Sequence, residues 1–361
     1  MERIAIVTLN GYFNYGNRLQ NYALQETLKT LGYSVETIRF NRDKKHNRYK
    51  FYLREIKKWI TNPSKNFTEK KRHEIFMEFS RKHILETERV FFMDDNFSQL
   101  NNMFDHFVVG SDQVWNPSMN KASSFFFLDF ADKNKRIAYS PSFGISELPN
   151  SITSDYQKWI KEIPFLSVRE DDGAKIIKDL SGREVDVLVD PTVLLTKEKW
   201  IDVAKSADNK PTEAYLLTYF LGGIPSEYKE QINEIAKIRG LTIINLGDIK
   251  ESDSYRTGPS EFIDYINDCS IFCTDSFHGA VFSIILEKPF IVYERVGAVS
   301  MYSRIDTLLN KFELNDRKSD NIKLDKKVFE VDFSHTQEIL EIEREHSYNF
   351  LKNALKIEGA N

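Results

Sequence analysis

Cysteine is scarce in this chain, and long apolar runs are missing. Among 361 residues there are two cysteines, Cys269 and Cys273, and no His or further Cys stands at metal-ligand spacing around them. We therefore expect packed, reduced thiols and neither a disulfide framework nor a metal centre. No apolar run reaches the roughly 18 residues that a membrane-spanning helix requires. Because residues 1–7 already read as a strand, we also expect no signal peptide and a cytoplasmic protein.

A strong excess of one charge is absent as well. The net charge of −4 is too small to indicate a nucleic-acid partner. The total conceals one basic segment, because residues 42–82 carry fourteen Lys or Arg against five Asp or Glu, with aromatic residues between them. Two interpretations stay open. The segment is either a solvated helical excursion with one packed face, or a surface for a pyrophosphate-linked acceptor or for anionic lipid at the inner face of the cell membrane.

What the chain does have is a regular alternation of strand and helix patterns. In its first half, short apolar runs typical of buried strands alternate with amphipathic stretches of helical period. The predicted strands are residues 3–9, 34–40, 104–109, 136–140, 165–168 and 185–189, and the predicted helices are 17–31 and 152–163. This order favours a mostly parallel sheet with right-handed crossovers.

A second cycle of the same kind begins near residue 210. Strands are predicted at 214–220, 241–246, 270–273 and 289–293, and helices at 226–239, 260–267, 280–287 and 303–312. The fold class is therefore α/β, with two Rossmann-like domains built on mostly parallel sheets. The predicted domains are residues 1–200, with a basic helical insertion at 42–90, and residues 210–335. A last helix within 336–361 is expected to pack back on the first domain.

The most informative segment is residues 273–280. An apolar strand stops there at small and acidic residues, and His278 and Gly279 open a helical pattern. An imidazole at a strand end and a helix start lies where α/β folds bind ligands and where backbone N–H groups attract anions. His278 is therefore a candidate acid, base or phosphate contact. A helix-capping or core histidine is the alternative, because Asp275 and Ser276 are ordinary N-cap residues.

Three arginines stand at or beyond strand ends. Arg169 directly follows the strand at 165–168, and a guanidinium there can bind a carboxylate or phosphate through two hydrogen bonds. Arg295 and Arg304 lie beyond the strand at 289–293, around a Gly-containing segment that can act as a lid. For each of them an ordinary surface ion pair is the alternative.

Two polar loops follow predicted strands. Residues 110–117 combine Asp112, Gln113, Trp115 and Asn116, a set that suits a sugar because its hydroxyls need paired donors and acceptors and its C–H face stacks on an aromatic ring. A tight turn with a packed tryptophan is the alternative. Residues 11–20 are a weak match to a nucleotide loop, since the spacing is not G-x-G-x-x-G. Their polar members fit the mouth of a binding site: Asn14, Asn17, Arg18 and Gln20.

Taken together, four of these segments resemble the polysaccharide pyruvyl transferase family. They are residues 14–25 (NYGNRLQNYALQ), 109–116 (VGSDQVWN), 167–170 (SVRE) and 275–279 (DSFHG). The order matches the family's order, and the resemblance covers residues from about 5 to 310. It implies two Rossmann-like domains arranged as in GT-B glycosyltransferases, with acceptor side first, donor side second and the site in the cleft between them.

The resemblance also implies a reaction. Phosphoenolpyruvate would be a co-substrate that gives its three-carbon unit to sugar hydroxyls in cell-surface polysaccharide synthesis, leaving a cyclic ketal and free phosphate. No cofactor or metal is implied. His278 and Asp112 would be catalytic. The donor would be bound by Arg169, Ser276, Gly279, Arg295 and Arg304. The acceptor would be bound by Asn14, Asn17, Arg18, Gln20, Gln113, Trp115 and Asn116.

One departure from the family pattern keeps alternatives open. Many members carry an arginine two residues before the histidine, and this chain has Ser276 there. Arg295 or Arg304 is expected to supply the missing charge. The alternative functions are a GT-B glycosyltransferase that uses a nucleotide-sugar, and a non-catalytic glycan-binding subunit.

Overall fold

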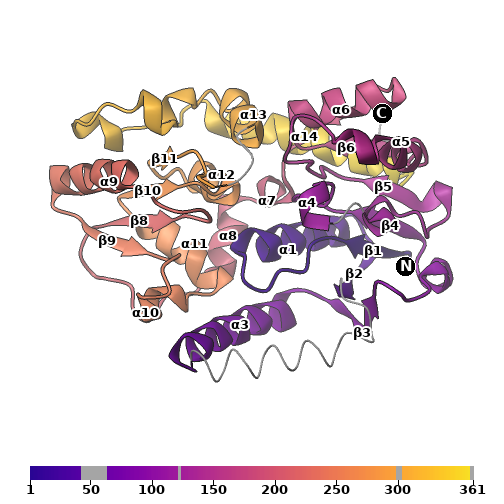
Figure 1. Ribbon diagram of the computed structural model, residues 1–361, viewed down its shortest axis with the longest axis horizontal. Coiled ribbons are helices and arrows are strands. Elements are labelled where there is room, and N and C mark those ends of the chain that lie inside the picture. The colour runs from indigo at the N-terminus through magenta and orange to yellow at the C-terminus, as the bar shows by residue number, and fades with distance from the viewer. Residues whose placement is uncertain (42–62, 121–122, 298–302, 358–361) are drawn as a thin grey trace. The chain divides into compact units, whose positions relative to one another are not determined.

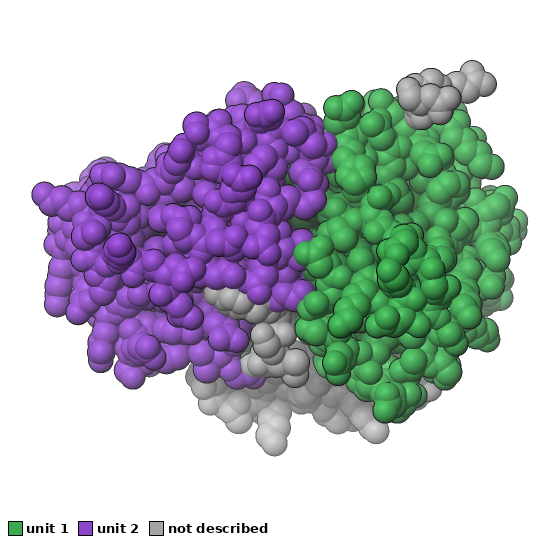
Figure 2. All heavy atoms as spheres, turned by 90° about the horizontal axis from the view of Figure 1, so that it is seen from above, with its two compact units in different colours: residues 1–194, 345–361 green, residues 195–344 purple. Residues whose placement is uncertain are grey.

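The computed structural model describes residues 1–41, 63–120, 123–297 and 303–357. The chain forms two compact units, which are coloured separately in Figure 2. Unit 1 comprises Met1–Leu194 and Glu345–Asn361, and unit 2 comprises Leu195–Arg344. Each unit has its own parallel sheet.

Unit 1 is built on a sheet with the strand order β3-β2-β1-β4-β5-β6-β7 in its described part (Figure 1). All adjacent strands pair in parallel, as expected for strands joined by helical crossovers. The strands are β1 (Arg3–Val7), β2 (Ser34–Asn41), β3 (Glu86–Phe92), β4 (His106–Val109), β5 (Arg136–Ala138), β6 (Phe165–Val168) and β7 (Asp186–Val187). The helices are α1 (Tyr15–Thr30), α3 (Pro63–His83), α4 (Pro117–Asn120), α5 (Thr153–Lys161), α6 (Asp171–Ser181) and α7 (Pro191–Leu194).

Unit 2 repeats the plan with the order β11-β10-β8-β9, again with parallel pairs throughout. Its strands are β8 (Tyr215–Tyr219), β9 (Thr242–Asn245), β10 (Ile271–Thr274) and β11 (Phe290–Val292). Its helices are α8 (Lys197–Val203), α9 (Ser226–Arg239), α10 (Ser252–Tyr255), α11 (Pro259–Asp268), α12 (Phe277–Ile285) and α13 (Ser303–Lys311). Helix α14 (Thr336–Ala354) begins in unit 2 and ends in unit 1.

Both strand orders contain a point at which the chain changes direction across the sheet. In unit 1 the chain moves from β1 outward through β2 and β3, and then returns to place β4 on the other side of β1. In unit 2 the same reversal separates β8 from β10. Ligands of open α/β sheets bind outside the carboxyl ends of the strands at such switch points. The fold therefore predicts two candidate ligand-binding places, one at the switch point of each unit.

Each predicted strand and helix has a counterpart in the structure, which adds elements that were not predicted, among them helices α6 and α8 and strand β3. The segment predicted as a helical insertion at 42–90 is helical over Pro63–His83, and its residues 42–62 lie outside the described part of the chain. After that helix the chain forms β3, an edge strand that the sequence analysis did not predict. Its exposed Glu88 and Arg89 interrupt the apolar alternation by which a strand is recognised.

Candidate functional site

The first cluster of polar side chains lies at the switch point of unit 1. Val7 of β1 is in register with Val109 of β4, so the two strands end at the same level. The segment after β4 carries Ser111 and Asp112, and the segment after β1 leads into helix α1. Asp112 takes a left-handed backbone conformation, with φ of 69°, which turns the chain sharply as it leaves the sheet. The residue is buried, at 7% exposure.

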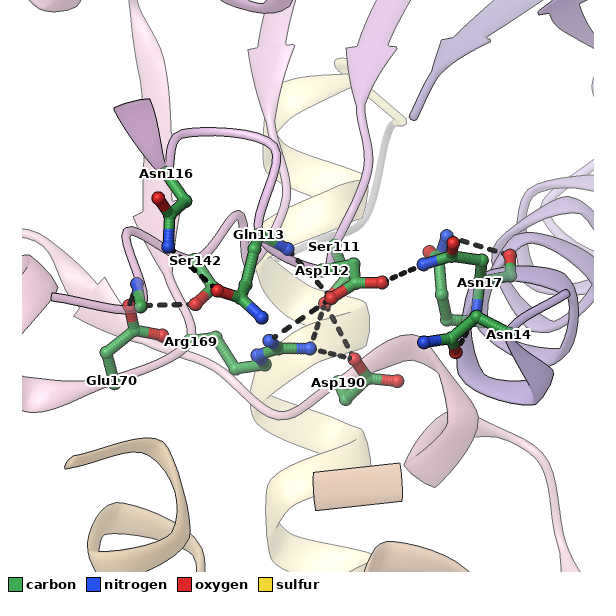
Figure 3. Close-up of polar contacts among 12 residues, drawn as sticks. Asn14, Asn17, Ser111, Asp112, Gln113, Asn116, Ser142, Arg169, Glu170 and Asp190 are labelled. Atoms are coloured by element: carbon green, nitrogen blue, oxygen red, sulfur yellow. Dashed lines mark hydrogen bonds and ion pairs between the residues drawn. The ribbon is translucent and has the colours of Figure 1, made fainter. Parts of the chain in front are cut away.

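Arg169 lies at the centre of this cluster (Figure 3). It follows β6 directly, and its side chain is only 1% exposed. Its Nη1 atom donates to Asp190 Oδ2 at 2.7 Å and to Ser111 Oγ at 3.3 Å, and its Nη2 atom lies 3.8 Å from Asp112 Oδ1. The guanidinium therefore links two carboxylates from different strand ends. A planar group with several fixed donors is suited to this task.

Asp190 is the firmly held member of the cluster. Its Oδ1 atom accepts hydrogen bonds from the backbone N–H and the hydroxyl of Thr192, and its Oδ2 atom also accepts from the Ser111 hydroxyl. With one arginine and two carboxylates, the group of Arg169, Asp112 and Asp190 carries a formal charge of −1. The cluster thus places the Asp112 carboxylate beside the guanidinium of Arg169, which forms an ion pair with it.

The other contacts of Asp112 come from the loop and from helix α1. Its Oδ1 atom accepts from the backbone N–H of Gln113 at 2.8 Å, and its Oδ2 atom accepts from the Asn17 side-chain amide. Asn17 is in turn placed by the start of α1, where the Asn14 side chain caps the helix by accepting from the Asn17 backbone N–H. Gly11 fits closely here, because a Cβ atom at that position would lie 2.2 Å from Asn17 Oδ1.

A second polar group borders Asp112 on the side of β5 and β6. The Asn116 amide donates to Gln113 Oε1 at 2.8 Å, and both side chains are buried. Gly144, with φ of 61°, fits against them, because a Cβ there would lie 2.4 Å from Gln113 Oε1. The fully buried Glu170 accepts at Oε1 from the backbone N–H groups of Phe143 and Gly144. Glu170 therefore fixes the turn that supports Gln113 and Asn116.

Three residues predicted to contact the acceptor are fully buried. The Trp115 ring stacks on Phe127 with centroids 5.0 Å apart, and its Nε1 donates to a backbone carbonyl. Arg18 is paired with Glu86 at 3.0 Å, and Gln20 donates to a threonine hydroxyl within the fold. In this structure their side chains support the loops that carry Asn14, Asn17 and Asp112. Because the Trp115 ring is buried against Phe127, we do not propose that a sugar stacks on it.

The second cluster lies at the switch point of unit 2. Thr274 of β10 is in register with Tyr219 of β8, so Asp275 reaches the segment that follows β8. Its carboxylate accepts from the backbone N–H groups of Leu221 at 2.7 Å and Gly222 at 2.8 Å. Asp275 is 2% exposed and thereby joins the carboxyl ends of the two central strands.

Helix α12 starts directly after Asp275 and carries the candidate histidine. Ser276 is its N-cap, with a side chain that accepts from the Gly279 backbone N–H at 3.3 Å. His278 lies in the first turn at 6% exposure. Gly279 permits the close approach of helix and strand, because a Cβ there would lie 2.9 Å from Thr274 Oγ1. Ser276, which stands where the family resemblance leads us to expect an arginine, thus acts as a helix cap.

Both arginines named as substitutes for that missing charge belong to this cluster. Arg295 places Nε 3.3 Å from Asp275 Oδ2, and its Nη2 atom donates to the Asp275 carbonyl at 3.1 Å. Arg304, in α13, lies with its guanidinium carbon 5.9 Å from the centre of the Phe277 ring. The predicted donor residues Ser276, Gly279, Arg295 and Arg304 therefore gather around the start of α12, whereas Arg169 belongs to unit 1.

Two acidic residues were missed as parts of the cluster by the sequence analysis. Asp190 pairs with Arg169 across 21 residues of sequence, and Glu170 fixes the turn at Gly144. Both follow predicted strands, and Glu170 also ends the SVRE segment, so the sequence carried a signal for each of them. Within the described ranges, no group of three or more His, Cys, Asp or Glu side chains is arranged to hold a metal ion. No helix there is long and apolar enough to cross a membrane.

The fold is shared with solved structures at low sequence identity. One is a Listeria monocytogenes protein assigned as a UDP-N-acetylglucosamine 2-epimerase, with a TM-score of 0.52 and 8% identity over 97% of this chain and 90% of that one. Another is Staphylococcus aureus MnaA in complex with UDP, with a TM-score of 0.51 and 10% identity over 99% of this chain and 98% of that one. These matches confirm the predicted fold class, α/β with two parallel sheets. No curated protein matches the sequence.

The site therefore defines an α/β protein with one polar cluster at the switch point of each sheet. The sequence model of the family "Polysaccharide pyruvyl transferase" matches residues 14–295. The chain belongs to the polysaccharide pyruvyl transferase family, as the four motifs predicted. The family name describes a transferase that acts on polysaccharide. The roles of the individual residues, and the predicted position of the site between two domains, stay predictions.

Proposed function

We propose that this protein transfers the three-carbon unit of phosphoenolpyruvate to hydroxyl groups of a sugar in a cell-surface polysaccharide or its precursor. The observation that carries the proposal is the carboxylate of Asp112, which Arg169 and Asn17 hold at the switch point of unit 1. The family name describes transfer to polysaccharide. A carboxylate held at the switch point is therefore suited to act as the base that accepts the proton of an acceptor hydroxyl. The donor is a cytoplasmic metabolite, so the proposal also implies a cytoplasmic enzyme.

The first step joins the acceptor to the donor. A sugar hydroxyl oxygen attacks C2 of phosphoenolpyruvate, and its proton passes to Asp112. The electron pair of the C2–C3 double bond takes a proton from His278, so that the methylene carbon becomes a methyl group. Histidine is suited to this role because its ordinary pKa is near neutrality. The product of the step is a tetrahedral carbon that still carries phosphate.

The second step closes the ketal. The bond between C2 and the phosphate oxygen breaks, and phosphate leaves with the bonding electrons. A neighbouring sugar hydroxyl then adds to C2, and its proton returns to His278. The products are a cyclic ketal and inorganic phosphate, and atoms and charges balance. Asp112 releases its proton to solvent before the next turnover.

The donor carries a carboxylate and a phosphate, so its site requires cationic groups. We propose that Arg295 and Arg304 supply them, since both lie close to the start of α12, where helical N–H groups also favour anions. Ser276 then serves as the helix cap. Arg169 acts mainly as a positioning residue, because two carboxylates already surround its guanidinium.

The experiment is a transfer assay with a panel of acceptors. The protein is incubated with phosphoenolpyruvate and synthetic or lipid-linked glycans, and both phosphate release and the mass of the glycan are measured. We expect phosphate release that depends on the acceptor, and a glycan mass gain equal to pyruvate less one water. Asp112→Asn should lose at least about 100-fold in rate, whereas Gln337→Ala, a site outside both clusters, should match the wild type. Transfer of a sugar from a nucleotide-sugar, or glycan binding without phosphate release, would refute the proposal.

We also propose a peripheral contact between the basic segment and anionic membrane. In its described part, Phe67 of α3 is 51% exposed and Lys71 lies 5.9 Å from the centre of that ring. Exposed aromatic and cationic side chains on one helix favour the interface of an anionic bilayer. A Lys70→Glu, Lys71→Glu variant should bind vesicles with 30% phosphatidylserine at least about fivefold more weakly. Equal binding by variant and wild type would leave α3 as a solvated helix.

A further inference from the structure

Unit 1 contains a pocket that the roles assigned above do not use. Its volume is about 470 Å³, which lies within the ordinary range for small-molecule sites. It opens beside the loop after β1, the end of β2 and the strand β3. Apart from Gly11, its lining residues are Asn10, Tyr12, Arg39, Phe40, Asn41 and Val90.

One aromatic side chain of the pocket, Tyr12, is held in place by a charged network. Its hydroxyl donates to the carboxylate of Glu86, at 3.1 Å from Oε2 and 3.3 Å from Oε1. The guanidinium carbon of Arg18 lies 4.8 Å from the centre of the Tyr12 ring, and Arg18 itself pairs with Glu86. Burial, together with the charge of Glu86, raises the pKa of Tyr12, so the phenol stays neutral. A ligand therefore meets a ring whose orientation is already fixed.

The second aromatic side chain, Phe40, is anchored from the core. Its ring stacks on Phe125 with centroids 4.1 Å apart and an interplanar angle of 18°, and Phe97 lies 6.0 Å away. Phe40 is nevertheless only partly buried and lines the pocket. The wall thus carries two rigid aromatic groups, which bind with little loss of side-chain entropy.

Polar groups stand beside these rings. Arg39 donates from Nη1 to the Glu88 carbonyl at 3.4 Å, and its side chain remains 34% exposed. Its Nε atom lies 3.9 Å from a Glu86 oxygen, which offsets much of its charge. The Asn10 amide donates to the Ile38 carbonyl at 2.9 Å. The pocket therefore offers aromatic surface and hydrogen-bonding groups without a strong net charge, which fits a neutral sugar better than a phosphate.

We propose that this pocket binds a sugar residue of the acceptor chain other than the one that reacts, an inference that rests on the proposed function. The loop that forms one wall continues directly into the candidate site. Gly11 packs against Asn17 closely enough to exclude a Cβ atom, and Asn17 donates to Asp112. A chain bound against Tyr12 is thus attached beside the segment that holds the proposed base. The pocket would select acceptors by length and by the identity of the sugar next to the reacting one.

The test measures sugar binding in the absence of phosphoenolpyruvate, so that it does not depend on catalysis. Saturation-transfer NMR is recorded on the full chain with methyl glycosides of glucose, galactose, mannose and N-acetylglucosamine. We expect signal from at least one of them, with affinity reduced at least about tenfold in Tyr12→Ala, since anchored aromatic groups dominate such contacts. Tyr12→Phe keeps the ring and should retain binding within about threefold. Gln337→Ala, which lines a different pocket in unit 2, should bind like the wild type.

The outcomes separate this inference from the proposed function. Arg39→Leu provides a second probe if Tyr12→Ala fails to fold, and it should also weaken binding because it removes the hydrogen-bonding head. The inference is wrong if no glycoside binds the wild type, or if binding is unchanged in both variants. Sugar binding that depends on Tyr12, without any transfer from phosphoenolpyruvate, would instead refute the proposed function. Transfer with an unchanged acceptor KM in Tyr12→Ala would refute the pocket alone.

Discussion

Replacing Arg169 by methionine tests how the cluster of unit 1 is held together. The substitution keeps an unbranched side chain of similar length but leaves Asp112 and Asp190 as buried carboxylates without their common cation. The ion pair between Arg169 and Asp190 has an N–O distance of 2.7 Å, and both side chains are at most 1% exposed. Breaking such a pair by removing one partner costs about 3–5 kcal/mol, because an uncompensated charge remains in the interior. We expect unit 1 to lose about that much of its free energy of unfolding.

The double variant Arg169→Met, Asp190→Asn supplies the matched control. It removes the second buried charge, while the asparagine carbonyl can still accept from the Thr192 backbone N–H. We therefore expect it to regain about half or more of the stability lost in the single variant, so that the two effects are strongly non-additive. Activity should stay low in both variants, because Asp112 has lost its contact with the guanidinium.

Urea unfolding followed by fluorescence measures both quantities. Among the described tryptophans, Trp115 and Trp159 lie in unit 1 and Trp200 in unit 2, so the signal contains contributions from both units. A loss below about 1 kcal/mol in Arg169→Met would refute the reasoning, since that is the range of exposed ion pairs. If the effect of the double variant equals the sum of the effects of Arg169→Met and Asp190→Asn measured separately, the reasoning is refuted as well.

Three further predictions concern unit 2. His278→Ala should lower turnover at least about 100-fold, and a near-wild-type rate would remove His278 from the mechanism. Gly279→Ala should lower the free energy of unfolding by about 1–3 kcal/mol, because its Cβ would lie 2.9 Å from a side-chain atom of β10. The control Gly223→Ala, whose Cβ would meet nothing within 4 Å, should leave stability unchanged in thermal unfolding. Cys269 and Cys273 should not react with DTNB until guanidinium unfolds the chain. The reason is that burial raises the pKa of both thiols, that of Cys273 to about 12. Rapid reaction of the folded protein would contradict this prediction.

The order of strands and helices could be predicted from the sequence because two signals agree. The spacing of apolar residues indicates the type of element, and residues that favour turns or caps mark where it ends. The helix expected at 17–31 is α1, Tyr15–Thr30, and the strand expected at 165–168 is β6. The strand and helix expected around His278 are β10 and α12. In each case a short apolar run ends at residues that favour turns or caps, so local preference and tertiary structure point to the same result.

The side-chain partners could not be predicted in the same way. Trp115 was expected to face a sugar, yet it stacks on Phe127, because composition does not reveal which way an aromatic residue points after a strand. Arg169 was expected to hold the donor, yet its nearest partner is Asp190. That contact depends on β6 and β7 being neighbours in the sheet, which is a property of topology and not of local sequence.

Helix α14 makes unit 1 discontinuous in sequence, and this constrains the order in which the protein can fold during synthesis. The ring of Phe350 lies 6.3 Å from that of Tyr139, and the carbonyl of Leu355 accepts from the Tyr33 hydroxyl at 3.3 Å. Leu351 is fully buried. A nascent chain that has passed residue 194 therefore cannot complete unit 1 until the ribosome has also made residues 195–355. Unit 2, which is continuous, can finish first, and the unit synthesised earliest is then the one that closes last.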